Sequence, residues 1–436
     1  MNTMTAHLTE QDYRVPENIA KAAILPESYT DEQAVTYPAF AWLRANNPFG
    51  VAHVEGYDPI WLATKHADIL EIEKNPAVFA SGMDEPNIND SASAGFLKMV
   101  NSGGSRTLDT LAYMDAPEHT KIKNVTSAWF MPASVRKRED EIRTLAKDAV
   151  DRLLSFDGEC DFVKDFAIYY PLRVIMSLFG VPPEDEPRML TLTQEMFGPA
   201  DPETQRAEMV PEPDAMARMW KAAIDDFSTY FNDLAAERRK NPTDDLASII
   251  ANAKVDGEYL SPSFINGYYV AIATAGHDTT SSTVSGAIKA LADNPDQLEK
   301  VRGDLSLIPS LVEEAVRYIS PVKHFQRVVT QDHEFRGRQL HRGDHVMLLY
   351  PSANRDEEVF DNPDQFDITR RPNKHIAFGH GPHMCIGQHV AKLEMRILFE
   401  ELLPRIRKVE VVGEPKYVAA NFLSGLKSLP VSITKA

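Results

Sequence analysis

The spacing of apolar residues along this chain is mostly that of helices. Apolar side chains that recur every three to four residues form a stripe on one helix face, and this period predicts amphipathic helices. The last such segment runs from Gly387 to about Leu403. The others cover 38–45, 66–74, 132–154, 166–179, 185–196, 213–240 and 309–319.

Short runs rich in β-branched and aromatic residues predict strands between these helices. They cover 51–54, 60–63, 325–329, 333–336 and 345–349, and strand-like pieces follow residue 403. Helix therefore dominates, and we expect a mainly α fold with small sheets.

The longest predicted helix has a polar interruption. Ser261 and Pro262 are typical of a helix cap and first turn, and helical spacing continues to about Asp293. The stretch 264–273 is apolar almost all round, which is typical of a helix in a protein core. Polar residues occupy 275–282, where hydroxyls can bond back to carbonyls four residues earlier and open the helix. Taken alone, this segment favours a satisfied polar patch that bends a long helix.

Length and composition limit the domain organisation. The 436 residues exceed the usual size of one domain, yet no Gly/Ser linker or charge block divides them. The longest polar, loop-like stretch is 82–105. We expect one domain, with a strand-containing part at about 30–110 and a helical core at about 111–436.

The charge and the N-terminal sequence exclude some partners and compartments. A net charge of −18, from 46 basic against 64 acidic residues, argues against nucleic acid as a partner. The first 30 residues hold no sustained apolar run, so we expect no signal peptide and no membrane contact. Two cysteines at unlike sites do not form a disulfide framework and fit a reducing cytosol. We therefore expect a cytoplasmic protein, and a monomer.

Cys385 lies in a glycine-rich, histidine-flanked loop, Phe378 to Gly387. A single thiolate can hold an iron when a porphyrin supplies the other ligands. The glycines let the backbone approach a flat macrocycle closely, and the N–H groups that start the next helix would stabilise a thiolate. The alternative is a small buried hydrophobic residue. We prefer that alternative for Cys160 and the iron ligand for Cys385.

The spacing Phe-x-x-Gly-x-x-x-Cys-x-Gly resembles the haem-binding loop of the cytochrome P-450 monooxygenases. The segment 275–279, Ala-Gly-His-Asp-Thr, resembles the oxygen-activation segment of that family. The resemblance implies the cytochrome P-450 fold, with the long helix over haem b and Cys385 as axial ligand. It also implies that Phe378 and Gly379 contact haem and that Gly276 leaves room for O₂. Asp278 and Thr279 would relay protons.

Other sequence elements of the cytochrome P-450 family are present, in the same order along the chain as in that family. Glu314 and Arg317 are three residues apart on one helix, and they match the family's Glu-x-x-Arg element, with Arg370 as third partner. The resemblance implies a structural role for these three. It also implies that the haem carboxylates bind His119, Lys123, Arg327 and His383, although the family more often has Arg at the position of Lys123.

The chain looks most similar to bacterial members that hydroxylate the monoterpene alcohol α-terpineol. A substrate pocket is expected from 83–110, 195–220, the long helix, 322–325 and the surroundings of Phe422. This lining would be apolar and suits a terpenoid or an aromatic hydrocarbon. Its predicted members are Phe96, Leu97, Ala271, Ala275, Val322, Phe325 and Phe422.

The chain shows no flavin or nicotinamide module, so the resemblance implies that a ferredoxin and its NAD(P)H-dependent reductase supply electrons. A basic face would attract an acidic ferredoxin. Two other hypotheses remain: a haem-thiolate peroxygenase, which needs no electron partner, and a non-enzymatic haem sensor. The predicted basic face consists of Lys121, Lys123, Arg136, Lys137, Arg138, Lys392 and Arg396.

Overall fold

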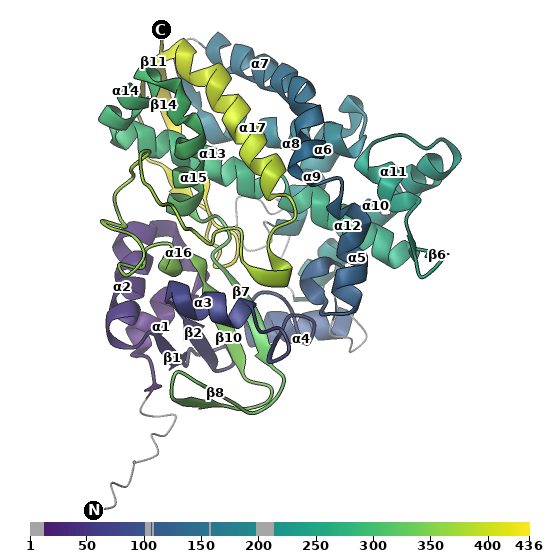
Figure 1. Cartoon of the computed structure of the whole chain (residues 1–436), viewed down its shortest axis with the longest axis vertical. Coiled ribbons are helices and arrows are strands. Elements are labelled where there is room, and N and C mark those ends of the chain that lie inside the picture. The colour runs from purple at the N-terminus through teal and green to yellow at the C-terminus, as the bar shows by residue number, and fades with distance from the viewer. Residues whose placement is uncertain (1–12, 101–105, 107–108, 157, 198–212) are drawn as a thin grey trace, which may run out of the picture.

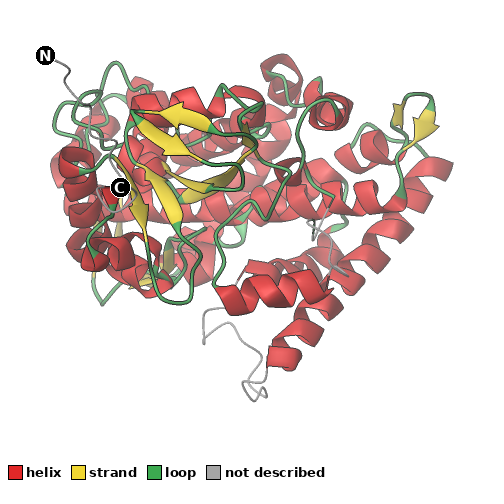
Figure 2. Cartoon of the chain, turned by 90° about the horizontal axis from the view of Figure 1, so that it is seen from below, coloured by secondary structure: helices red, strands yellow, loops and turns green. Residues whose placement is uncertain are grey.

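A computed structural model describes residues 13–100, 106, 109–156, 158–197 and 213–436 (Figure 1). Helices make up most of it; most strands lie toward the left in Figure 2, and one short hairpin lies at the far right. The N-terminal segment, in purple, lies beside the largest group of strands, whereas the C-terminal helix α17 (Gln388–Leu402), in yellow, lies toward the other end of the molecule.

The helical part is built around α17. This helix packs against α7 (Glu139–Ser155), α13 (Asp278–Asp293) and α15 (Ile308–Ile319). Their facing apolar side chains belong to one large buried cluster, which excludes water and stabilises the arrangement. The core therefore fixes α17, and with it the loop that carries Cys385.

The remaining helices surround this core and the sheet. They are α1 (Glu17–Ile24), α2 (Tyr37–Asn46), α3 (His66–Glu73), α4 (Ser91–Val100), α5 (Glu118–Ser127), α6 (Pro132–Val135), α8 (Tyr170–Phe179), α9 (Glu186–Phe197), α10 (Pro213–Lys240), α11 (Leu246–Ala251), α12 (Pro262–Ala275), α14 (Pro295–Gly303) and α16 (Tyr350–Ala353).

The largest sheet has the strand order β1-β2-β10-β7-β3. Val346 on β10 lies opposite Arg327 on β7 and beside Trp61 on β2. Because side chains alternate along a strand, Phe325 and Arg327 project from the same face of β7. The strands are β1 (Phe49–Ala52), β2 (Ile60–Ala63), β3 (Phe79–Ala80), β7 (His324–Val329) and β10 (His345–Leu349).

A smaller sheet has the strand order β11-β14-β4, with β14 in the centre, and the other strands form two-stranded sheets. The strands are β4 (Glu159–Asp161), β5 (Lys254–Val255), β6 (Glu258–Tyr259), β8 (His333–Phe335), β9 (Arg338–Leu340), β11 (Ile406–Val411), β12 (Lys416–Tyr417), β13 (Leu426–Ser428) and β14 (Pro430–Lys435).

Three predictions about local structure were wrong. The helix predicted over 262–293 is divided into α12 and α13, because the chain opens at Gly276 and His277. The polar stretch 82–105, predicted as a loop, contains α4. The Asp90 carboxylate accepts hydrogen bonds from backbone N–H groups of the first turn of α4, which is the role of a helix cap.

The segment predicted as one helix over 132–154 is also divided. A 3₁₀ turn at Arg136–Arg138 separates α6 from α7. Among the helices that the structure describes, none is both long and apolar enough to cross a bilayer.

Candidate active site

The opening between α12 and α13 forms one wall of the site. The Thr279 hydroxyl donates a hydrogen bond to the Ala275 carbonyl at 2.8 Å, the back-bonding that can open a helix. A Cβ at Gly276 would lie 2.9 Å from Ile175, so glycine lets α8 pack closely against the opening. The break therefore combines this local back-bonding with the close packing of α8.

His277 orients Asp278 beside this opening. The imidazole is fully buried, and its Nε2 lies 2.7 Å from the Ile168 carbonyl oxygen. A carbonyl only accepts, so Nε2 carries the proton and the Nδ1 of a neutral ring is an acceptor. Nδ1 lies 3.3 Å from Asp278 Oδ1. Burial raises the pKa of Asp278, and His277 partly opposes this shift. The Asp278 carboxyl is therefore held beside the His277 ring at the opening.

The loop that carries Cys385 requires glycine at two positions. Gly379 and Gly381 have φ values of +67° and +65°, a region that other residues rarely adopt. A Cβ at Gly381 would also lie 2.4 Å from the Glu73 carbonyl oxygen. The Cys385 N–H donates to the Phe378 carbonyl at 2.9 Å, which closes the loop.

The Cys385 thiol faces the cavity, and backbone N–H groups surround its sulfur. Burial raises the pKa of this thiol, whereas the N–H groups of Gly387 and Gln388 and the charge of Lys123 act to lower it. A metal binds the thiolate, and these same donors stabilise that form. The sulfur can therefore bind a cation on the side that faces the cavity.

An apolar cavity of about 330 Å³ lies between the opened helix and this loop. Cavities of this order hold small ligands. The predicted site residues that line it are His119, Lys123, Ala271, Ala275, Gly276, Thr279, Val322, Phe325, Arg327, Phe378, Gly379, His383 and Cys385.

Three predicted residues are not among those that line this cavity in the described part of the chain. Asp278 lies behind Thr279 and contacts His277. Phe422 contacts the ring of Phe325, with centroids 5.4 Å apart, and so supports the lining from behind. Leu97 lines a separate cavity of about 290 Å³ beside His345. The side chain of Phe96 and most of 195–220 lie outside the residues that the structure describes.

A basic cluster lies on one side of the cavity. The rings of His119 and His383 have centroids 4.2 Å apart. Burial and nearby cations lower the pKa of His383 to about 2, and burial and Lys123 also lower the pKa of His119. Both imidazoles are thus neutral hydrogen-bonding groups, while Lys123 and Arg327 supply charge. Such a set suits two carboxylates.

Sequence reasoning missed two buried carboxyl groups that line the cavity, Glu73 and Glu394. The Thr280 hydroxyl donates to Glu394 Oε1 at 3.0 Å, and burial raises the pKa of Glu394 well above its ordinary value. A usable signal existed, because each glutamate occupies a position in the apolar stripe of its helix. In α3 the stripe includes Ile69 and Ile72, both of which precede Glu73 on the buried face.

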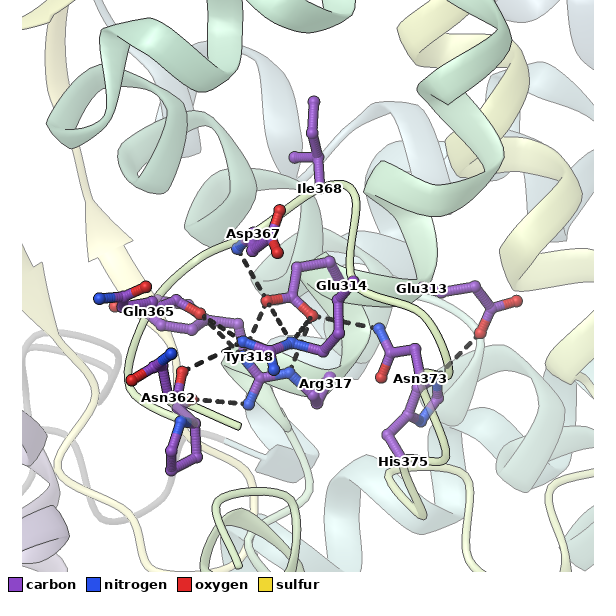
Figure 3. A network of polar contacts seen from close by, with 12 residues as sticks. Glu313, Glu314, Arg317, Tyr318, Asn362, Gln365, Asp367, Ile368, Asn373 and His375 are labelled. Atoms are coloured by element: carbon purple, nitrogen blue, oxygen red, sulfur yellow. Dashed lines mark hydrogen bonds and ion pairs between the residues drawn. The ribbon is translucent and has the colours of Figure 1, made fainter. Parts of the chain in front are cut away.

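Glu314, Arg317 and Arg370 form a buried network at the base of α15 (Figure 3). Both Glu314 oxygens accept from Arg317 at 2.8 Å and from Arg370 at 3.2 Å. Arg317 also donates to the carbonyls of Asn354 and Pro363 at 2.8 Å. The network joins α15 to the segment that precedes the Cys385 loop, as the proposed structural role requires.

Most members of the predicted basic face contact carboxylates. Their ion pairs are Lys121 with Asp256, Arg138 with Asp244, Lys392 with Glu313 and Arg396 with Glu139. Lys123 donates to the carbonyls of Pro382 and Met384 beneath the loop. The exposed positive charge is therefore smaller than the sequence predicted, and it centres on Arg136 and Lys137.

Comparison with known proteins decides the family. The family model named Cytochrome P450 matches residues 108–416. This chain belongs to the cytochrome P450 family. Its fold is the P450 fold: the crystal structure of CYP108D1 from Novosphingobium aromaticivorans superposes with a TM-score of 0.90 at 40% identity, covering 97% of this chain and 100% of that chain.

Named relatives place this P450 among the monooxygenases. Cytochrome P450-terp from a Pseudomonas species is 52% identical over 97% of this chain and 99% of its own length. Linalool 8-monooxygenase from Pseudomonas putida is 30% identical over 93% of this chain and 97% of its own length. The enzyme class is thus that of the cytochrome P450 monooxygenases, and the family implies a haem-thiolate cofactor and the use of O₂.

Proposed function

We propose that this P450 hydroxylates a monoterpene alcohol, with haem b ligated by Cys385 and electrons supplied by a ferredoxin. The observation that carries this proposal is the Cys385 thiol facing an apolar cavity whose far wall is an opened helix. The similarity to P450-terp and to an enzyme named for linalool, a monoterpene alcohol, supports the substrate class.

The residues present fit haem. A thiol with two backbone N–H groups aimed at it can serve as an anionic axial ligand. His119, Lys123, Arg327 and His383 would hold the two carboxylates. Gly381 leaves the loop backbone close to α3, where any Cβ would collide. When bound, haem supplies O₂ binding and the oxidising chemistry.

Protons would reach the site through the opened helix. Asp278, whose Oδ1 lies 3.3 Å from His277 Nδ1, can take a proton from the outer side of the opening and release it inward. Thr279 lines the cavity, and its hydroxyl is held by the Ala275 carbonyl, so its oxygen keeps a lone pair for a proton donor. The apolar lining excludes other water, which keeps protons on this route.

Substrate titration tests the proposed class. In the haem-loaded protein, terpene alcohols should displace water at the iron and shift the Soret band from the low-spin to the high-spin position. Fused and linked aromatic hydrocarbons should give a smaller shift at equal concentration. A shift only with the aromatics would overturn the terpene assignment and leave the monooxygenase class intact.

Replacing Thr279 with alanine should uncouple electron use from product. We expect the yield of hydroxylated product per electron to fall roughly tenfold, with the electrons recovered as hydrogen peroxide, because proton delivery is misdirected. Reduction of the iron should be unchanged. Thr279→Ser, which keeps the hydroxyl, is the control and should retain most of the coupling. Tight coupling in Thr279→Ala would exclude the relay role.

Charge reversal at Arg136 and Lys137 tests ferredoxin binding. The double variant R136E/K137E should slow association with an acidic ferredoxin about tenfold at low salt, because electrostatic attraction accelerates encounter. The rate should also lose much of its salt dependence. K240E/K300E makes the same charge change on the exposed faces of α10 and α14. Equal stopped-flow reduction rates in both double variants would refute docking at Arg136 and Lys137.

A further inference from the structure

Glu73 is a buried carboxyl in the wall of the haem cavity, and the proposed roles above leave it without a function. Its side chain is 1% exposed, and the residue lines the cavity from the C-terminal end of α3. A carboxyl in such a position is costly unless its oxygens are bonded or it carries a proton. Its placement therefore calls for an explanation from its neighbours.

The bonding of Glu73 is incomplete. Oε1 accepts a hydrogen bond from the Tyr350 hydroxyl at 2.8 Å and lies 3.7 Å from Arg327 Nη2. Oε2 is buried and has no hydrogen-bond partner among the described residues. The Arg327 guanidinium instead donates from Nη1 to its neighbour, the Gln326 carbonyl, at 2.8 Å. Glu73 thus faces Arg327 as a counter-charge at a distance longer than a hydrogen bond.

Arg327 is also a residue that would hold a haem carboxylate. Two carboxyl groups would then share one guanidinium in a dry site, and two negative charges so close oppose each other. One of them must take up a proton or lose part of its interaction. Because the haem carboxylate would also have His119, Lys123 and His383 nearby, Glu73 is the carboxyl group whose proton affinity rises more.

We propose that Glu73 is a positioning residue that acts through Arg327 and takes up a proton when the haem iron is reduced. This inference rests on the proposed haem site at Cys385. Reduction by one electron, from an iron–sulfur protein or a chemical donor, converts Fe(III) to Fe(II) and adds one negative charge. One proton from solvent converts the Glu73 carboxylate to a neutral carboxyl, so the net charge of the site is unchanged.

The groups that face Glu73 agree with this assignment. They are Arg327 on β7, Tyr350 on α16 and the N–H of His380 in the loop, and all three act to lower its pKa. Burial outweighs them and raises the pKa of Glu73 to about 7. A haem carboxylate held by Arg327 would raise it further, and so would reduction. Glu73 should therefore titrate at neutral to alkaline pH.

The sign of the pH dependence follows from this coupling. Reduction raises the pKa of Glu73, so the reduced state binds more protons between the two pKa values. The midpoint potential of the iron should therefore fall as pH rises from slightly acidic to moderately alkaline values, and should level off at both ends.

Three proteins test the proposal: wild type, Glu73→Gln and Tyr350→Phe. Glu73→Gln removes the titration and keeps the shape, whereas Tyr350→Phe removes the 2.8 Å bond to Oε1 and keeps the carboxyl. Spectroelectrochemical titration with chemical mediators should show the pH-dependent fall in wild type and in Tyr350→Phe. The potential of Glu73→Gln should be independent of pH in this range and higher than that of alkaline wild type.

A second measurement tests the positioning role of Glu73. Haem transfer to an apoglobin should be faster from Glu73→Ala than from Glu73→Gln, because alanine leaves Arg327 without its neighbour. A wild-type potential independent of pH, or an equal pH dependence in Glu73→Gln, would overturn the inference. Failure of the proposed function is distinguishable, because it would appear as the absence of thiolate ligation in the wild-type spectrum.

Discussion

Replacing Cys385 with serine should abolish monooxygenase activity while the polypeptide still folds. In the proposed site the thiolate would donate electron density to the iron and promote O–O cleavage, which a hydroxyl cannot do. We expect turnover to fall by about 10³-fold or more, equivalent to about 4 kcal/mol of activation free energy. The measurement is product formation under saturating substrate and electron supply, with the Soret band of the reduced carbon monoxide complex recorded beside it.

Cys160 offers a matched control within the same chain. It lies on β4, and burial raises the pKa of its thiol to about 11, so it remains a neutral thiol. Cys160→Ser should keep the thiolate-type Soret band and wild-type turnover within roughly a factor of two, as expected for a site outside the cavity. Wild-type turnover in Cys385→Ser would contradict the assigned ligand.

Of the substitutions proposed for this protein, Arg317→Ala should cause the largest loss in the free energy of unfolding. Arg317 and Glu314 are both fully buried, and removal of one partner leaves a buried charge and several carbonyls without donors. We expect a loss of about 3–5 kcal/mol in the free energy of unfolding. Denaturant titration of the haem-loaded protein measures it through both far-UV circular dichroism and the Soret band.

An exposed ion pair provides the comparison. Lys289 and Asp293 pair four residues apart on α13, and about half of the Asp293 side chain is exposed. Lys289→Ala should change the free energy of unfolding by no more than about 1 kcal/mol. If Arg317→Ala cost no more than Lys289→Ala, the network of Figure 3 would not hold the segment before the Cys385 loop.

The residues of the candidate site could be predicted from the sequence more completely than the structure around them. The loop glycines and Cys385 carry their own signal, because their spacing reflects close backbone approach at fixed positions. Periodicity also placed several elements with correct bounds, among them 213–240 and 60–63. These segments are governed by local patterns of apolar residues, which a sequence displays directly.

The predictions from sequence failed where contacts between distant segments determine the local structure. The opening at Gly276 depends on Ile175 and on the Ile168 carbonyl, which belong to a different part of the chain. Periodicity alone favours one continuous helix there. The reduced basic face has the same cause, since the carboxylates that pair with Arg138 and Lys392 come from distant segments. Charge counting along a sequence cannot locate such partners.

Glu73 and Glu394 show a signal that was present and not used. A carboxylate in the apolar stripe of a helix has two explanations. Either the stripe has been assigned to the wrong face, or the carboxylate is a buried ionisable group. After Glu394 the buried stripe continues with Ile397 and Leu398, which rules out the first explanation for that helix. Buried ionisable groups gather at functional sites, so the helical pattern by itself directs attention to the cavity.

X-ray absorption at the iron edge of the haem-loaded protein tests the central claim most directly. We predict one sulfur atom in the first coordination shell of the iron, present in wild type and in Cys160→Ser and absent in Cys385→Ser. An iron bound only by nitrogen and oxygen, or a sulfur signal that survives in Cys385→Ser, would contradict the account.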